Sequence, residues 1–166
     1  MVSKSQLGLR ASQFFWTLLI TALVGNVIAT AFATNSSVNY AMFVAAFSWI
    51  VLLLGFAAAW MEQLNIILIP LDALATIFTF VAGVVLAAKL HVHSCGNSNY
   101  TTTNSLTRLS HNTGKRCHEL QASTAFFWFL FASYVGSLAL DFVKGGSSSM
   151  RGPSFGRKGV PSMSQV

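Results

Sequence analysis

Charged residues are scarce in this chain. They make up 8% of its 166 residues, and only four of them are acidic. A soluble domain carries about a quarter charged residues, so this composition excludes an ordinary soluble domain. With so few acids there is no carboxylate pair placed for acid–base chemistry, and the sequence has neither a Ser/His/Asp arrangement nor a glycine-rich phosphate loop. We therefore expect no enzymatic activity and no cofactor.

Cysteine is scarcer still. The two cysteines, Cys95 and Cys117, bracket a polar stretch. As a disulfide they would close a loop of about 23 residues and constrain it by about 3 kcal/mol on the chain-entropy model. The alternative is a metal site, since His91, His93 and His118 lie beside them. However, His-x-His-x-Cys matches no common zinc spacing, and an oxidising compartment would remove the thiolates, so the disulfide is favoured and no metal is expected.

In place of charge the chain has apolar sequence, at 54% of its residues. It is concentrated in four runs, each long enough to cross the hydrocarbon core of a bilayer as a helix. The sequence therefore predicts an all-α membrane protein, a four-transmembrane-helix antiparallel bundle. The domain is expected at 14–143, with spans at about 14–33, 40–60, 66–88 and 121–143. The remaining segments are a polar lead at 1–13, a long loop at 89–120, and a basic tail at 144–166 that is too poor in apolar residues to fold alone.

The first apolar run could also belong to a cleaved signal peptide, because residues 31–33 imitate a small-residue cleavage site. The run is longer than an ordinary signal core, and three more spans follow it. These features favour a first helix that is retained.

The ten Lys and Arg residues give a net charge of +6, but they lie in the tails and loops. Because they form no basic helix face, we exclude nucleic acid as a partner. Six of the cations are in the two tails and four are in the long loop, a bias that favours cytosolic termini. We expect the tail cations to contact anionic lipid of the inner leaflet: Lys144, Arg151, Arg157 and Lys158.

The long loop carries the sequon Asn99-Tyr100-Thr101, which makes Asn99 a candidate for glycosylation. A sequon and a cysteine pair in one loop both favour its placement on the oxidising, non-cytosolic face. We therefore expect an extracellular loop.

Small residues recur every fourth position in two of the spans, which places them along one stripe of each helix. Such stripes let a second helix approach closely in lipid, where apolarity alone cannot drive association. We predict helix packing and self-association through the two stripes: Thr21, Gly25, Ala29 and Ala33 in the first span, and Ala75, Thr79, Gly83 and Ala87 in the third.

Asp72 is the one acid that could lie within the membrane, and it has two interpretations. It could be a polar anchor between helices, or a proton or cation site. Alternatively, Pro70 is the first helical residue and Asp72 a first-turn acid at the inner interface, favoured by the helix dipole. We favour the second interpretation, because Pro70 is an independent signal for the start of a helix.

The fourth span begins with an aromatic cluster that wraps all sides of a helix, so some of its rings must face lipid. They could form a surface that contacts sterol or sphingolipid, or an ordinary apolar exterior. The candidates for lipid contact are Phe126, Phe127, Trp128, Phe129 and Phe131.

Short segments spread over most of the chain resemble the fungal non-classical export protein 2 family. They include Val38-Asn39-Tyr40, Leu71-Asp72, Phe78-Thr79-Phe80, Ala82-Gly83, His93-Ser94-Cys95, Arg116-Cys117, Gln121-Ala122, Gly159-Val160-Pro161 and Ser164-Gln165-Val166. The resemblance implies a MARVEL-type four-span fold, a shared disulfide frame at the two ends of the loop, and no catalytic residues. It also implies a role in eisosomes, the sterol-rich furrows of the fungal plasma membrane, with links to sphingolipid sensing and to protein export.

From residues and resemblance together we expect a non-enzymatic organiser of plasma-membrane domains. Its expected partners are membrane lipids (sterol, sphingolipid and anionic inner-leaflet lipid), further copies of itself and, by resemblance, eisosome coat proteins. Two alternatives stay open. One is a small transporter or proton-coupled channel that uses Asp72, and the other is a cargo factor in vesicle traffic or non-classical export.

Overall fold

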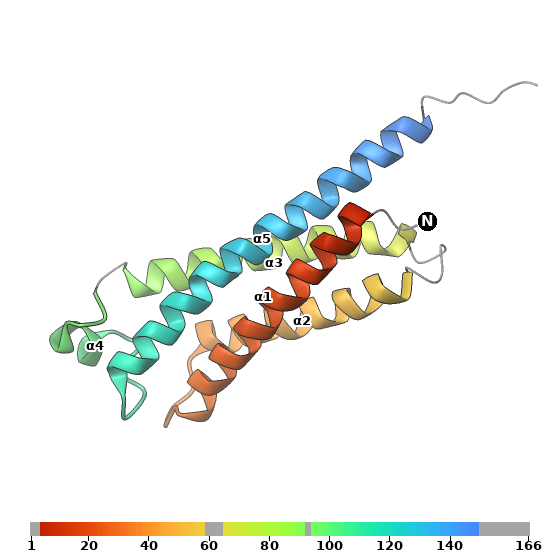
Figure 1. Ribbon diagram of the computed structural model, residues 1–166. Coiled ribbons are helices and arrows are strands. Elements are labelled where there is room, and N and C mark those ends of the chain that lie inside the picture. The colour runs from red at the N-terminus through yellow and green to blue at the C-terminus, as the bar shows by residue number, and fades with distance from the viewer. Residues whose placement is uncertain (1–3, 59–64, 92–93, 150–166) are drawn as a thin grey trace, which may run out of the picture.

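The computed structural model describes residues 4–58, 65–91 and 94–149, and all its regular elements are helices. Four are long, and a fifth, α4, is short (Figure 1). Each long helix has the length and apolarity needed to cross a membrane. The predicted all-α, four-span fold is therefore confirmed. The helices are α1 (Lys4–Ala29), α2 (Ser36–Ala58), α3 (Asn65–Leu90), α4 (Ser98–Thr103) and α5 (Thr113–Ser149).

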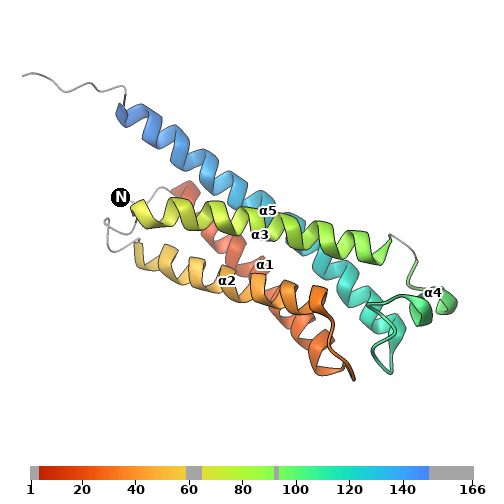
Figure 2. The same ribbon diagram turned by 180° about the vertical axis from the view of Figure 1, so that it is seen from behind.

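The four long helices form a closed ring. α1 packs against α2 and α5, and α3 packs against the same two helices. Among the described residues, α1 and α3 are therefore diagonal neighbours that do not pack directly on each other. Consecutive long helices run antiparallel, as Figures 1 and 2 show from opposite sides. We call the end that carries α4 the loop end, and the end where α1 begins and α5 finishes the termini end.

The first and last long helices extend furthest beyond their predicted spans. α1 begins at Lys4, inside the expected polar lead, and α5 runs from Thr113 to Ser149. The prediction of disorder from residue 144 is thus wrong for 144–149, because a helix already formed in an apolar run extends into polar neighbours at little cost. At its other end, α5 is capped by the Asn112 side chain, which accepts a hydrogen bond from the Lys115 amide at 3.0 Å.

A disulfide and several hydrogen bonds fasten the long loop across the loop end. Cys95 and Cys117 are bonded with their Cα atoms 5.6 Å apart, which confirms the predicted pair and withdraws both thiolates from the metal alternative. His93 lies outside the described residues. Tyr100 donates to the Leu90 carbonyl, and burial raises the pKa of its phenol, so it stays protonated as a donor. Asn104 binds the last turn of α3 by donating to a backbone carbonyl, at 2.9 Å.

The same loop also holds the turn between α1 and α2. The Phe32 amide donates to the Leu109 carbonyl at 3.2 Å, and Ala31 forms an isolated antiparallel bridge with Ser110. The turn between the first two spans is thus joined to the loop between the last two, which closes the ring at this end.

The two small-residue stripes lie in different surroundings. On α3, Ala75 and Thr79 are fully buried, and a Cβ added to Gly83 would lie 3.3 Å from Cε2 of Trp128 on α5. The α3 stripe therefore serves helix packing within the chain, as predicted, because α5 occupies the close approach at Gly83. Self-association stays a prediction. On α1, nothing lies within 4 Å of an added Cβ at Gly25, and Ala29 is exposed. Ala33 is also exposed, but it lies in the turn after α1.

This difference predicts opposite effects of one substitution at two glycines. Gly83→Leu should lower the free energy of unfolding by about 1–3 kcal/mol, because the new side chain must displace the Trp128 indole. Gly25→Leu is the matched control and should leave stability nearly unchanged. Thermal unfolding of the purified proteins in detergent makes the comparison. Equal midpoints for both variants would contradict the close approach of α3 to α5.

Candidate functional site

A buried ion pair crosses the diagonal of the ring. Arg10 of α1 donates from Nη1 to Oδ1 of Asp72 on α3 at 2.8 Å, and from Nη2 to Oδ2 at 2.5 Å. The Asp72 residue is 0% exposed and Arg10 is 8% exposed. The two planar groups meet in the bidentate geometry in which charge-assisted hydrogen bonds are strongest. The pair therefore joins the two helices that do not pack on each other.

The other two helices complete the surroundings of this ion pair. Gln13 accepts a hydrogen bond from Arg10 Nη1 at 3.0 Å and donates to Ser137 Oγ of α5 at 2.9 Å. On α2, a Cβ added to Gly55 would lie 2.9 Å from Arg10 Nε, so the absence of a side chain there makes room for the guanidinium. All four spans thus contribute to one polar cluster, formed by Arg10, Gln13, Gly55, Asp72 and Ser137.

The favoured interpretation of Asp72 is wrong. Helix α3 begins at Asn65, so Pro70 lies inside the helix and Asp72 about two turns from its start. A spanning helix tolerates an internal proline because neighbouring helices and side chains satisfy the freed backbone groups. Asp72 therefore lies in the core and is held by a cation from another helix.

Arg10 is the residue that sequence reasoning missed, since it was assigned to the polar lead. One signal could have found it. A buried acid in a membrane span requires a partner, and Arg10 lies three residues before Gln13, which places both on one face of α1. The deletion of either charge would leave the other buried without a partner.

The chemistry of this cluster suits a structural role. The cation and the anion neutralise each other, and both Asp72 oxygens accept from Arg10. Such a pair is strongly destabilised when one partner is removed, because the remaining charge is uncompensated in a low dielectric. The cluster can thus hold the four helices in register at one depth of the membrane.

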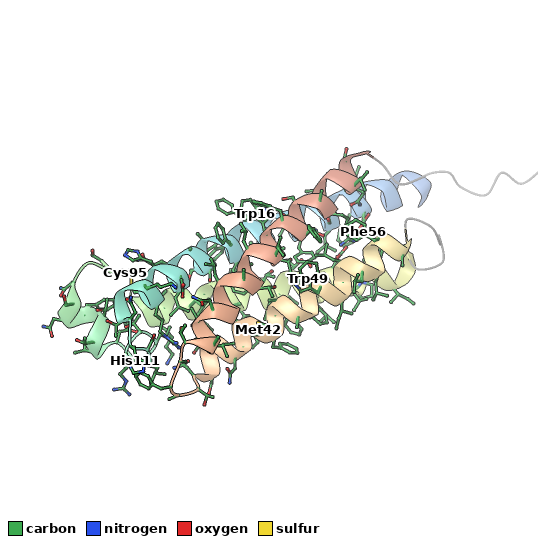
Figure 3. The ribbon with its side chains drawn as sticks, turned by 60° about the horizontal axis from the view of Figure 1, so that its bottom comes forward. Trp16, Met42, Trp49, Phe56, Cys95 and His111 are labelled. Carbon is green, nitrogen blue, oxygen red and sulfur yellow. A yellow bond between two sulfur atoms is a disulfide. The ribbon has the colours of Figure 1, made fainter. Side chains whose placement is uncertain are left out.

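The predicted aromatic surface divides into a buried part and two exposed clusters. Phe127 is 0% exposed, so its assignment to lipid contact is wrong, because this face of α5 is covered by the neighbouring helices. Trp128 and Phe129 are 39% and 51% exposed. Trp16 of α1 stacks on Phe129 at a centroid distance of 4.9 Å and also on Phe126 at 5.5 Å; Figure 3 shows Trp16 at the outside of the bundle.

The second exposed cluster joins α5 to α3. The Phe80 ring lies 5.7 Å from that of Trp128 and 5.4 Å from that of Phe131, between ring centroids. Edge-to-face and offset contacts of this kind stabilise the rings beyond their burial alone. The rings of these two clusters therefore contact one another between helices, α1 with α5 in one and α3 with α5 in the other.

The remaining predicted residues are only partly described. Asn99 is exposed on α4, whereas its sequon partner Thr101 is buried and donates to the Ser98 carbonyl at 3.1 Å. Glycosylation of Asn99 stays a prediction. Of the tail cations, Lys144 lies within α5 but its side chain is outside the described part, as are residues Arg151, Arg157 and Lys158.

Comparison with known proteins gives the class first. The profile of the MARVEL family, described as a membrane-associating domain, matches residues 2–140. The ring of four spans is thus a membrane-associating domain of a kind that is not enzymatic. No solved structure is significantly similar to the chain.

Individual relatives then give the family. Non-classical export protein 2 of Saccharomyces cerevisiae is 33% identical, with 95% of both chains covered. Non-classical export protein 2 homolog 1 of the same organism is 35% identical over 90% of each chain, and Non-classical export protein 102 of Candida albicans is 34% identical over 95% of each. The chain therefore belongs to the MARVEL family and, within it, to the fungal non-classical export protein 2 group, which confirms the resemblance seen in the sequence.

The tight fit of Arg10 beside α2 generates a prediction. Gly55→Ala should destabilise the protein by about 1–3 kcal/mol, because the added methyl meets an arginine that the ion pair prevents from moving away. Gly8→Ala is the matched control. Nothing lies within 4 Å of its added Cβ, so it should be neutral or stabilise the helix by up to about 1 kcal/mol.

An Asp72→Asn background sharpens this test. Once the ion pair is weakened, Arg10 can shift, and Gly55→Ala should cost less than it does in the native chain. Urea or thermal unfolding in detergent measures the native protein, both single variants and the double variant. If the cost of Gly55→Ala is the same with and without Asp72→Asn, the ion pair does not hold Arg10 in place.

Proposed function

We propose that this protein is a non-enzymatic organiser of the plasma membrane. It assembles or shapes sterol- and sphingolipid-linked domains of the eisosome type and responds to the level of sphingolipid. The bundle acts through its surface, which meets lipid and other proteins, and not through a reaction at an internal site.

The observation that carries the proposal is the separation of polarity in the bundle. The charges of Arg10 and Asp72 are paired in the interior, whereas the exterior presents large apolar side chains around the ring. The rings of Trp128 and Phe129 are part of that exterior and are fixed by contacts between helices. A rigid aromatic surface presents the same shape to the lipid around it, and this is what an organiser of lipid domains requires.

The two ends of the bundle suit different compartments. The disulfide between Cys95 and Cys117 supports an extracellular loop end, since such bonds persist in oxidising surroundings. The termini end then lies in the cytosol, where the basic tail can meet anionic lipid and coat proteins. This orientation places the recognition of outer lipid and of cytosolic partners at opposite ends of one rigid body.

Self-association in this proposal uses the part of the α1 stripe formed by Gly25 and Ala29, since Thr21 accepts a hydrogen bond from the Trp49 indole of α2 at 3.0 Å. Gly25 and Ala29 are not covered closely by the chain's own helices, in contrast to the α3 stripe. Small residues on an uncovered helix face allow a second backbone to approach in lipid. A second copy is the partner that would use this face.

The transporter alternative has less support, because both carboxylate oxygens of Asp72 are bound to Arg10. An acid that cycles protons or cations must be able to release its partner. The export alternative has only the names of the relatives in its favour.

Live-cell imaging tests the proposal. A copy with a C-terminal tag is imaged beside a cortical coat marker, before and after sphingolipid synthesis is blocked. We expect static cortical patches that coincide with the marker and disperse on the block. A uniform or vesicular signal that is indifferent to sphingolipid would contradict the proposal.

Gly25→Leu is tested in the same imaging experiment, beside Gly83→Leu, which disturbs packing inside the bundle. Gly25→Leu should leave the folded bundle intact but reduce clustering, because its side chain points to space that a second copy would occupy. Normal clustering in a stable Gly25→Leu protein would exclude the α1 stripe as the contact between copies.

A further inference from the structure

A cavity of about 520 Å³, lined by both polar and apolar residues, opens at the loop end between the end of α1 and the start of α5. Its walls come from the turn after α1, from the segment around His111, and from the first turns of α5. A smaller cavity of about 150 Å³ shares Ala31, Phe32 and Arg116 with the first. Figure 3 shows His111 at this end of the molecule, far from Trp49 and Phe56.

Arg116, which lines the cavity, is a buried cation. The residue is 1% exposed, and its guanidinium donates from Nε to the Leu106 carbonyl and from Nη1 to the Val27 carbonyl, both at 2.6 Å. Among the described residues these two bonds engage Nε and Nη1, so Nη2 remains to bind a ligand. The cation is therefore fixed by backbone carbonyls, and the carboxylate that acts on its charge is that of Glu119.

A second cation lies at the rim of the cavity. The Lys115 side chain is 61% exposed, and its Nζ is 3.7 Å from Oε1 of Glu119, beyond hydrogen-bond distance. The same Oε1 of Glu119 also accepts a hydrogen bond from the Asn26 side-chain amide at 2.5 Å, and a bond from a neutral amide leaves the negative charge of the carboxylate in place. The lining thus has two cations, Lys115 and Arg116, against the single carboxylate of Glu119, and this excess of positive charge favours an anion.

The size and the depth of the cavity narrow the choice of anion. A volume of this size suits a small organic group and exceeds what a bare phosphate would fill. The cavity adjoins the outward end of the α1 span, where Ile28 and Phe32 are exposed apolar residues at 37% and 61%. A site where an apolar span gives way to polar loop lies at the level of the lipid headgroups.

We propose that this cavity binds a phosphate-bearing headgroup, with the phosphate held by Arg116 and Lys115. The shared chemistry is a phosphate ester, which a lipid of the adjoining leaflet or a soluble molecule could supply. As a site of lipid recognition the inference rests on the proposed function, but as a binding site it can be tested without it.

The test uses the purified full-length protein in an uncharged detergent and native mass spectrometry to count bound molecules. The probes are dihexanoyl phosphatidylglycerol, its soluble headgroup glycerophosphoglycerol, inorganic phosphate, and dihexanoylglycerol, which lacks phosphate. We expect the phosphate ester probes to bind more tightly than the other two. Binding of the lipid alone identifies a membrane source, and equal binding of the soluble headgroup identifies a soluble one.

Three variants locate the site. Lys115→Gln should weaken binding about fivefold, as expected for the loss of one cation near a membrane surface. Arg116→Lys keeps the charge but loses the guanidinium geometry, and should weaken binding about tenfold or more. Arg108→Gln is the matched control, because Arg108 is an exposed cation of the same loop that lines neither cavity. Thermal midpoints confirm that each variant is folded.

Several results would overturn the inference: no binding, equal binding of dihexanoylglycerol, binding of inorganic phosphate alone, or an equal loss in Lys115→Gln and Arg108→Gln. The native protein is studied both by imaging and in the binding assay, so that a failure of this inference can be told from a failure of the proposed function. If the native protein fails to bind the probes but still forms sphingolipid-dependent patches, only the cavity assignment falls. If it binds the probes but forms no patches, the site stands and the organiser role falls.

Discussion

The ion pair between Arg10 and Asp72 is the constraint on which the rest of the bundle depends. Helices in lipid gain nothing from apolarity alone, so their register must come from close packing and polar contacts. Here the ion pair links the diagonal helices α1 and α3. Gln13 of α1 also donates a hydrogen bond to Ser137 of α5, and Gly55 leaves room for the Arg10 guanidinium beside α2. Any sliding or tilting of one helix would separate two buried charges, so the pair fixes all four helices at one depth.

The two ends of the bundle are fixed by different means. At the loop end the disulfide and the backbone bonds between 31–32 and 109–110 tie both interhelical connections together. The interior between this cap and the ion pair is packed, and Gly83 of the α3 stripe lies against Trp128. These links favour a rigid bundle. This rigidity suits a protein proposed to order the lipid around it, and it places the cavity beside Arg116 on a stable frame.

Much of the fold could be predicted from the sequence, because the spans are set by long apolar runs and the disulfide by two cysteines at the ends of a polar loop. What escaped prediction depends on which helix faces which. The aromatic run of α5 has no clear period, so Phe127 could not be told from its exposed neighbours until α1 and α3 were placed. Likewise, Pro70 signals a helix start in local terms, but α3 begins at Asn65 and tolerates the proline inside it. Arg10 was not predicted as a core residue, because it lies near the N-terminus, where a cation is usually solvated.

The coupling energy between Arg10 and Asp72 tests this account most directly. A double-mutant cycle with Arg10→Met and Asp72→Leu, followed by unfolding in detergent, isolates the pair from the rest of the cluster. Each single variant should lose about 3–5 kcal/mol, because each leaves a buried charge without its partner. The double variant should lose much less than the sum of the two. If the two losses simply add, the residues act independently and the ion pair does not hold the bundle together.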